Sequence, residues 1–206
     1  MGDFFVNEAF ASHRPAASTT VLASLLPHAA GLRFAKEVEV LNHVIKEPKK
    51  PLVAVIGGAK VEDKLAVVES LAKVADAVLL GGKLLHEIRE KNMTFPNNVQ
   101  VGRLSDDGFD LAPETIMLFQ GIISRAAQVI WSGPLGKFED GHNAGNRAVA
   151  GAITYSGADS IVGGGDTIAC LNSIQMLDKM KFVSTGGGAM LKLLAGGTLP
   201  TIESLN

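Results

Sequence analysis

The 206-residue chain has very little of several features that would direct it toward particular classes of protein. A single cysteine, Cys170, excludes an internal disulfide and favours a reducing compartment. No apolar run approaches the roughly 20 residues of a membrane span, and no charged-then-apolar segment marks a secretory signal. The net charge of −2 provides no bulk attraction to nucleic acid or to an anionic membrane. We therefore expect a cytoplasmic protein that has neither nucleic acid nor membrane as a partner.

Two common nucleotide fingerprints are also missing. The chain contains neither the Walker pattern GxxxxGK[ST] nor a GxGxxG turn after a strand. The second absence argues against a dinucleotide-binding oxidoreductase domain, which is a less favoured alternative. The five histidines do not have the spacing of metal ligands. A nucleotide site in this chain would therefore be of a different kind.

What the sequence does contain is a repeated unit of a short apolar run, glycines and then a helical stretch. The runs that end in or near glycine are PLVAVIGG (51–58), DAVLLGG (76–82), AQVIWSG (127–133), ADSIVGGG (158–165) and KFVSTGGG (181–188). Helices are predicted over 61–75, 113–126 and 143–155, and NVQVG (98–102) is a further short strand. Strands that are apolar on both faces and alternate with helices are typical of a parallel sheet covered on both sides. We predict an α/β fold, a three-layer open parallel sheet of Rossmann-like type.

The glycines fall where each predicted strand ends. In open α/β sheets, ligands bind at the carboxyl ends of the strands. Glycine-rich turns there expose backbone N–H groups at helix N-termini, which bind phosphate well. One such turn could be glycine-rich only because it is tight. Four turns carrying GG, GG, GGG and GGG favour a phosphate site along this edge.

Several side chains near these turns could take part, and each has a plainer alternative. Lys60 and Lys64 lie four residues apart on one helix face, and Lys64 could reach a phosphate, although both could be solvated surface charges. Asp166 could cap a helix, or bind Mg²⁺ together with phosphate oxygens. Thr167 could donate its hydroxyl to a phosphate. Glu139 could accept hydrogen bonds from ribose hydroxyls or be a surface glutamate.

Two further positions are singled out. Trp131, the single tryptophan, is predicted to be a core aromatic at the end of its strand. Arg14, beside His13, is suited to a bidentate contact with a carboxylate or a phosphate.

Five segments together resemble the successive motifs of the phosphoglycerate kinase family, in order and spacing, from about Asp3 to about Leu205. They are VNEAFASHRPAAST, VAVIGGAKVEDK, VIWSGPLGKFE, SIVGGGDT and FVSTGGGAMLKLLAGGTLP. The resemblance implies two α/β lobes that close by a hinge, one holding phosphoglycerate and the other the nucleotide. It implies a glycolytic kinase that moves a phosphoryl group between 1,3-bisphosphoglycerate and ADP, giving 3-phosphoglycerate and MgATP.

The resemblance also assigns roles to residues of this chain. Nucleotide binding falls to Gly58, Ala59, Lys60, Lys64, Gly81, Gly82, Gly133, Pro134, Glu139, Gly164, Gly165, Asp166 and Thr167. The catalytic positions are Lys64, Gly165 and Gly187. Amides of Gly186, Gly187 and Gly188 donate to the transferring phosphoryl group. Asp166 holds Mg²⁺, and Arg14 contacts phosphoglycerate.

The chain also departs from the family pattern. Residues 1–45 are expected to be a remnant of the N-terminal lobe with a connecting helix, and 46–206 the nucleotide-binding lobe. Ser132 replaces the asparagine of WNGP, Lys83 replaces a third glycine, and 85–110 is shorter by about one helix. We expect this chain to supply the Mg-nucleotide site for ADP or ATP, with 1,3-bisphosphoglycerate or 3-phosphoglycerate as a partner if an N-terminal lobe is supplied. The alternative is a non-catalytic nucleotide-binding half-protein that needs a separate N-terminal lobe.

Overall fold

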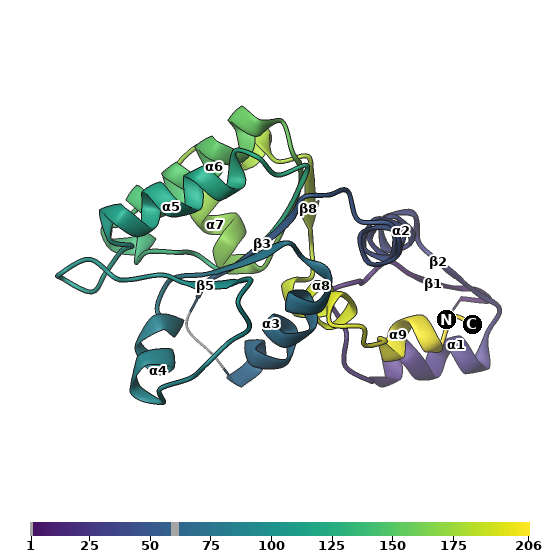
Figure 1. Ribbon diagram of the computed structural model, residues 1–206. Coiled ribbons are helices and arrows are strands. Elements are labelled where there is room, and N and C mark those ends of the chain that lie inside the picture. Colours follow the sequence, from purple (N-terminus) through teal and green to yellow (C-terminus); the bar gives the residue numbers. More distant parts are fainter. Residues whose placement is uncertain (1, 59–61) are drawn as a thin grey trace.

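A six-stranded parallel sheet forms the centre of the molecule (Figure 1). The computed structural model describes residues 2–58 and 62–206. In spatial order the strands are β5 (Val99–Val101), β4 (Ala77–Leu80), β3 (Leu52–Ile56), β6 (Gln128–Ser132), β7 (Asp159–Gly163) and β8 (Phe182–Ser184). Every predicted strand is present in this sheet. The central strands β3 and β6 are buried along their whole length, as expected for a sheet covered on both faces.

Helices cover both faces of this sheet (Figure 1). On one face lie α3 (Glu62–Val74), α4 (Leu84–Glu90) and α8 (Gly187–Leu194). On the other lie α5 (Pro113–Ile123), α6 (Ala144–Ser156) and α7 (Gly165–Ser173). The helices predicted over 113–126 and 143–155 are thus confirmed to within a few residues. Gly157, in the left-handed conformation, ends α6 where a side chain would be strained. The three-layer α/β prediction is confirmed.

The N-terminal segment forms a smaller unit beside this sheet. Strands β1 (Phe5–Asn7) and β2 (His28–Ala30) pair in parallel and are joined through η1 (Ala17–Val21) and α1 (Leu22–Leu25). Helix α2 (Leu32–Lys46) then leads to β3, and it also packs against α8. The C-terminal α9 (Pro200–Glu203) packs against η1 and so lies beside the N-terminal unit (Figure 1). The division at residues 45 and 46 stays a prediction, and α9 lies with the N-terminal unit.

The core of the large sheet includes Trp131, as predicted. Its side chain is fully buried, and its indole Nε1 donates a hydrogen bond to the carbonyl of Gly133 at 2.9 Å. Across the described ranges, no helix combines the length and apolar character that a membrane crossing requires.

Candidate functional site

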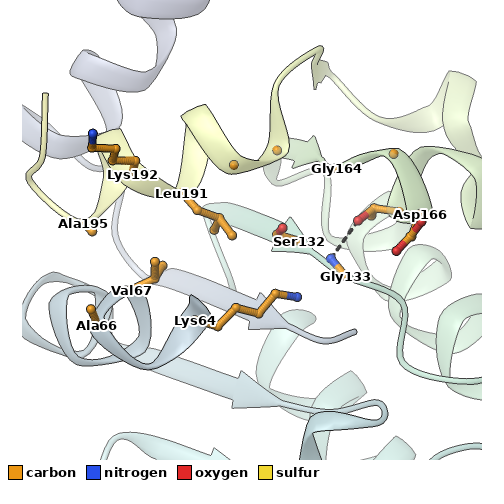
Figure 2. A pocket seen from close by; sticks show the side chains of 14 residues that line it. Lys64, Ala66, Val67, Ser132, Gly133, Gly164, Asp166, Leu191, Lys192 and Ala195 are labelled. Atoms are coloured by element: carbon orange, nitrogen blue, oxygen red, sulfur yellow. Dashed lines mark hydrogen bonds between the residues drawn. The ribbon is translucent and has the colours of Figure 1, made fainter. Parts of the chain in front are cut away.

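Two cavities adjoin at the carboxyl ends of the strands. The first has a volume of about 530 Å³ and lies between α3, α7 and α8 (Figure 2). The second, of about 540 Å³, lies beside the turns that follow β3, β4 and β6. Asp166 lines both cavities, so they meet at this residue. A single elongated ligand could therefore occupy both, with Asp166 near its middle.

Most of the predicted site residues line one of these cavities. The first brings together Lys64, Gly133, Gly164, Gly165, Asp166, Thr167, Gly187 and Gly188. The second brings together Gly58, Gly82, Pro134, Glu139 and, again, Asp166. The lining also includes two positions at which the chain departs from the family pattern, Ser132 in the first cavity and Lys83 in the second.

Three other predicted residues lie elsewhere. Gly81 lies beneath side chains, since a Cβ on it would be 2.6 Å from a methyl carbon of Leu135. Gly186 packs against the N-terminal unit, because a Cβ there would be 2.8 Å from the Cα of Ala11. Arg14 is exposed on the loop before η1 and is not part of the described lining of either cavity. Two more, Ala59 and Lys60, lie outside the described residues.

Several of the glycines are required by packing between the turns themselves. A Cβ on Gly133 would lie 2.1 Å from the carbonyl oxygen of Gly57, and one on Gly82 would lie 2.5 Å from that of Pro134. A Cβ on Gly187 would lie 2.4 Å from the Cα of Gly164. At these positions the backbones touch one another. The close approach brings the N-termini of α7 and α8 to the same cavity.

Gly165 differs from those glycines. A Cβ on Gly165 would meet no atom within 4 Å, and its backbone is not in the left-handed region. It is the first residue of α7, it is exposed, and it lines the first cavity. Neighbouring protein atoms therefore do not explain why a side chain is missing there. A ligand at the helix N-terminus could occupy this space.

The first cavity is suited to an anion. Helices α7 and α8 both begin at it, and their N-cap residues, Gly164 and Gly186, make no side-chain capping bond to the first turn. The amides of a helix start attract negative charge. Lys64 extends from α3 toward Ser132 and Gly133 (Figure 2), and its ammonium group donates a hydrogen bond to the carbonyl of Gly57. The cavity thus combines amide donors and a cation.

Thr167 joins two of the loops. Its buried hydroxyl donates to the carbonyl of Gly163 at 2.9 Å and accepts from the amide of Gly133 at 2.7 Å. The hydroxyl proton predicted to reach a phosphate is therefore engaged within the protein. The contact holds the turn after β6 against the turn after β7, and both turns line the first cavity.

Asp166 does not cap α7, because Gly164 occupies the N-cap position. Its carboxylate is exposed in the first turn, where the two cavities meet. Mg²⁺ is commonly held by one or two carboxylates together with phosphate oxygens. Within the described ranges no group of three or more His, Cys, Asp and Glu residues could hold a metal. A magnesium ion at Asp166 would therefore take its other ligands from a bound phosphate and from water, which fits an exposed carboxylate.

Sequence reasoning missed Glu37, which positions the loop before α8. Its fully buried carboxylate accepts hydrogen bonds from the Thr185 amide at 2.7 Å and hydroxyl at 2.9 Å, and it pairs with Arg33 at 3.1 Å. Arg33 also donates to the carbonyl of Val183. The helical spacing of the sequence could have indicated this role. Glu37 falls between Phe34 and Leu41 on the apolar face of α2, where a buried charged residue needs a partner.

Comparison with known proteins identifies the family to which the chain belongs. The family model of phosphoglycerate kinase matches residues 1–92 and 85–197. The phosphoglycerate kinase of Herpetosiphon aurantiacus is 36% identical over 255 residues, covering all of this chain and 65% of the relative. That of Rubrobacter xylanophilus is 35% identical, covering 98% of this chain and 64% of the relative. The chain thus spans slightly less than two thirds of the length of these relatives.

Solved structures of the family have the same fold. Phosphoglycerate kinase from Coxiella burnetii superposes with a TM-score of 0.83 at 32% identity, covering 98% of this chain and 65% of that one. The enzyme from Pyrococcus horikoshii gives a TM-score of 0.84 at 29% identity, with coverage of 98% and 64%. Matches in sequence and in structure both extend over nearly the whole chain. The chain therefore belongs to the phosphoglycerate kinase family, a family of kinases.

Proposed function

We propose that the two adjoining cavities bind a magnesium nucleotide, with its phosphates in the first cavity and its ribose and base in the second. The observation that carries the proposal is the open space at Gly165, beside amides of two helix N-termini. Glu139 lines the second cavity, where it can accept hydrogen bonds from ribose hydroxyls. Asp166 is placed between the two parts and would hold Mg²⁺ against the phosphates.

A glycine substitution tests this proposal without disturbing the fold. Gly165→Ala places a methyl group in the open space, where we expect it to displace phosphate and weaken MgADP binding at least tenfold. Gly151→Ala is the matched control, because a Cβ on Gly151 of α6 also meets nothing within 4 Å but lies away from both cavities. Calorimetric titration with MgADP measures both variants. Equal affinities for the two would contradict the proposal.

The reaction that we propose for the site is phosphoryl transfer between 1,3-bisphosphoglycerate and ADP, giving 3-phosphoglycerate and ATP. Family membership supports this reaction, and so does the meeting of two helix N-termini at one cavity. Catalysis of this kind depends on positioning and on neutralising the charge of the phosphoryl group, without a covalent enzyme intermediate. In this chain the amides at Gly165 and Gly187, together with Lys64, would provide that neutralisation.

Turnover by this chain alone is a separate question. We expect little or none, because the chain spans 65% of its relatives and Arg14 is its single predicted phosphoglycerate contact. A coupled assay of ATP formation measures turnover with and without a separately produced N-terminal lobe. Activity that appears only with the added lobe supports the proposed reaction. Nucleotide binding with no activity in either case favours a non-catalytic binding protein, and clear turnover by the chain alone contradicts our expectation.

A further inference from the structure

The turn that follows β6 borders both cavities. Gly133 lines the first cavity, and Pro134, Leu135 and Gly136 line the second. A shift of this turn would therefore change the shape of both cavities at once. A nucleotide that occupies both cavities, as proposed above, passes alongside this turn. The inference that follows rests on that proposed function.

Hydrogen bonds from other segments hold the first half of the turn. The amide of Gly133 donates to the hydroxyl of Thr167 at 2.7 Å, and its carbonyl accepts from the indole of Trp131 at 2.9 Å. The carbonyl of Pro134 accepts from the amide of Gly58 at 2.8 Å. The first half of the turn is thus fixed to α7, to its own strand β6 and to the turn that follows β3.

Asn146, in the first turn of α6, holds the second half. Its Oδ1 accepts a hydrogen bond from the amide of Leu135 at 2.8 Å. Asn146 and Leu135 are both fully buried, so bulk water does not compete for this contact. The position of the Leu135 backbone therefore depends on the oxygen that Asn146 presents to it.

Packing alone would not favour asparagine at this position. The Nδ2 group of Asn146 is buried and has no hydrogen-bond partner among the described residues. A buried donor without an acceptor destabilises the folded state, and asparagine is a weaker helix former than leucine. Leucine at position 146 would avoid both costs, but it could not accept a hydrogen bond from Leu135. What asparagine contributes is the acceptor for the turn.

We propose that Asn146 is a positioning residue for the nucleotide, because it holds the turn at 133–136 in the shape that fits the ligand. Asn146 is not part of the described lining of either cavity, so it acts through the turn and not by touching the ligand. Without its oxygen, the amide of Leu135 has to find another acceptor, and the turn has to move to reach one. Weaker nucleotide binding by a chain that still folds is the expected consequence.

Asn146→Leu tests this proposal, because leucine branches at Cγ as asparagine does but has no oxygen. We expect MgADP to bind about tenfold more weakly, as for the loss of one buried hydrogen bond. The matched control is Ile153→Val, a buried change later in α6 and outside both linings, which should lower stability and leave the affinity unchanged.

Calorimetric titration with MgADP measures the parent and both variants. An affinity of Asn146→Leu equal to that of the parent would overturn the inference and leave the nucleotide site standing. An equal loss of affinity in Ile153→Val would also overturn it, because the loss would then follow stability. Failure of the parent chain to bind MgADP would overturn the proposed function as well.

Trp131 gives a readout of the turn that a general loss of stability does not move. It is the single tryptophan, so its indole N–H, which is bonded to Gly133, gives one resonance in the ¹⁵N-labelled chain. We expect this resonance to shift in Asn146→Leu and to shift far less in Ile153→Val. An indole resonance that is unchanged in Asn146→Leu would show that Asn146 does not position the turn.

Hydrogen exchange of the parent chain tests the same contact if Asn146→Leu does not fold. The amide of Leu135 should exchange slowly, and more slowly still when MgADP is bound, because the ligand and Asn146 favour the same position of the turn. Rapid exchange of this amide, or exchange that saturating MgADP does not slow, would overturn the inference.

Discussion

Asp110 shows how a single buried carboxylate builds the wall behind the second cavity. It accepts hydrogen bonds from the amides of Ala144 at 2.7 Å, Gly145 at 3.2 Å and its own neighbour Leu111 at 2.8 Å. Two of these amides belong to the first turn of α6, where the N–H groups have no acceptor within the helix and need one from elsewhere. A Cβ on Gly136 would lie 2.7 Å from the same carboxylate. Glycine at 136 therefore leaves room for Asp110.

Replacing Asp110 with asparagine should destabilise the protein. The amide nitrogen of asparagine cannot accept a hydrogen bond, so at least one amide at the start of α6 loses its partner. We expect the free energy of unfolding to fall by about 1–3 kcal/mol. Urea denaturation measures the loss, and exposed Asp106→Asn is the matched control, expected to change stability by less than about 0.5 kcal/mol. Identical denaturation midpoints for the two variants would contradict this role of Asp110.

Asp166 gives a second test at the residue scale. If its carboxylate holds Mg²⁺ against the phosphates, Asp166→Ala should weaken ADP binding more strongly when magnesium is present than when it is removed with EDTA. Without magnesium, the loss of a negative charge beside the phosphates could even strengthen the binding of ADP. Paired calorimetric titrations with and without magnesium measure the two effects. Equal losses under both conditions would show that Asp166 does not act through the metal.

At the scale of elements, ion pairs tie strands together at the edge of the sheet opposite the cavities. Asp159 is the first residue of β7 and accepts from Lys181, just before β8, at 2.7 Å. It also pairs with Lys49, which precedes β3. Hydrogen bonds from Lys181 and, to a smaller extent, from Lys49 hold the pKa of Asp159 below its ordinary value of 3.8. The contacts link the starts of three strands.

This lowered pKa predicts how stability depends on pH. The folded state favours ionised Asp159, so its contribution is present at neutral pH and is lost as the pH falls below 3.8 toward the lowered folded pKa. Asp159→Asn should therefore melt at a lower temperature than the parent at neutral pH, and the difference should shrink in acid. Thermal melts from neutral pH to about pH 3 check the trend. A difference that stays constant over that range would rule out the ionised carboxylate as the cause.

Local pattern predicted the elements of the large sheet well. A run such as Leu52–Ile56 is apolar on both faces, which is decisive for a buried parallel strand, and Pro113 at a helix start marks α5. The contacts that join distant segments were not predictable in this way. Glu37 and Thr185 are 148 residues apart, and only the folded chain places them together.

The glycines show a similar limit at the candidate site. Sequence alone predicted that glycines gather at one edge of the sheet, and they do follow the strands at that edge. It could not separate Gly133, which is required by a neighbouring backbone, from Gly165, which faces open space. That distinction depends on the distance between turns from different strands, so it needed the three-dimensional arrangement. The individual binding roles at this edge stay predictions.

At the scale of the whole molecule, the chain is shorter than the stretch of its relatives that it matches. The alignment with the Herpetosiphon protein runs over 255 residues, whereas this chain has 206, and the two family matches meet at residues 85–92. Residues 85–92 include most of α4, and a short loop connects this helix to the three-residue edge strand β5. The same region carries His86 and leads to Asp107. Both residues line the second cavity, so this region lies beside it.

The account depends most on the claim that the amides of the two cavities bind one nucleotide. Amide chemical shifts of the ¹⁵N-labelled chain, recorded during titration with MgADP, test it directly. We predict large shifts for Gly58, Gly164, Gly165 and Gly187, and little change for Gly121 and Gly151 on α5 and α6. Shifts scattered over unrelated surfaces, or no shifts at saturating MgADP, would contradict the claim.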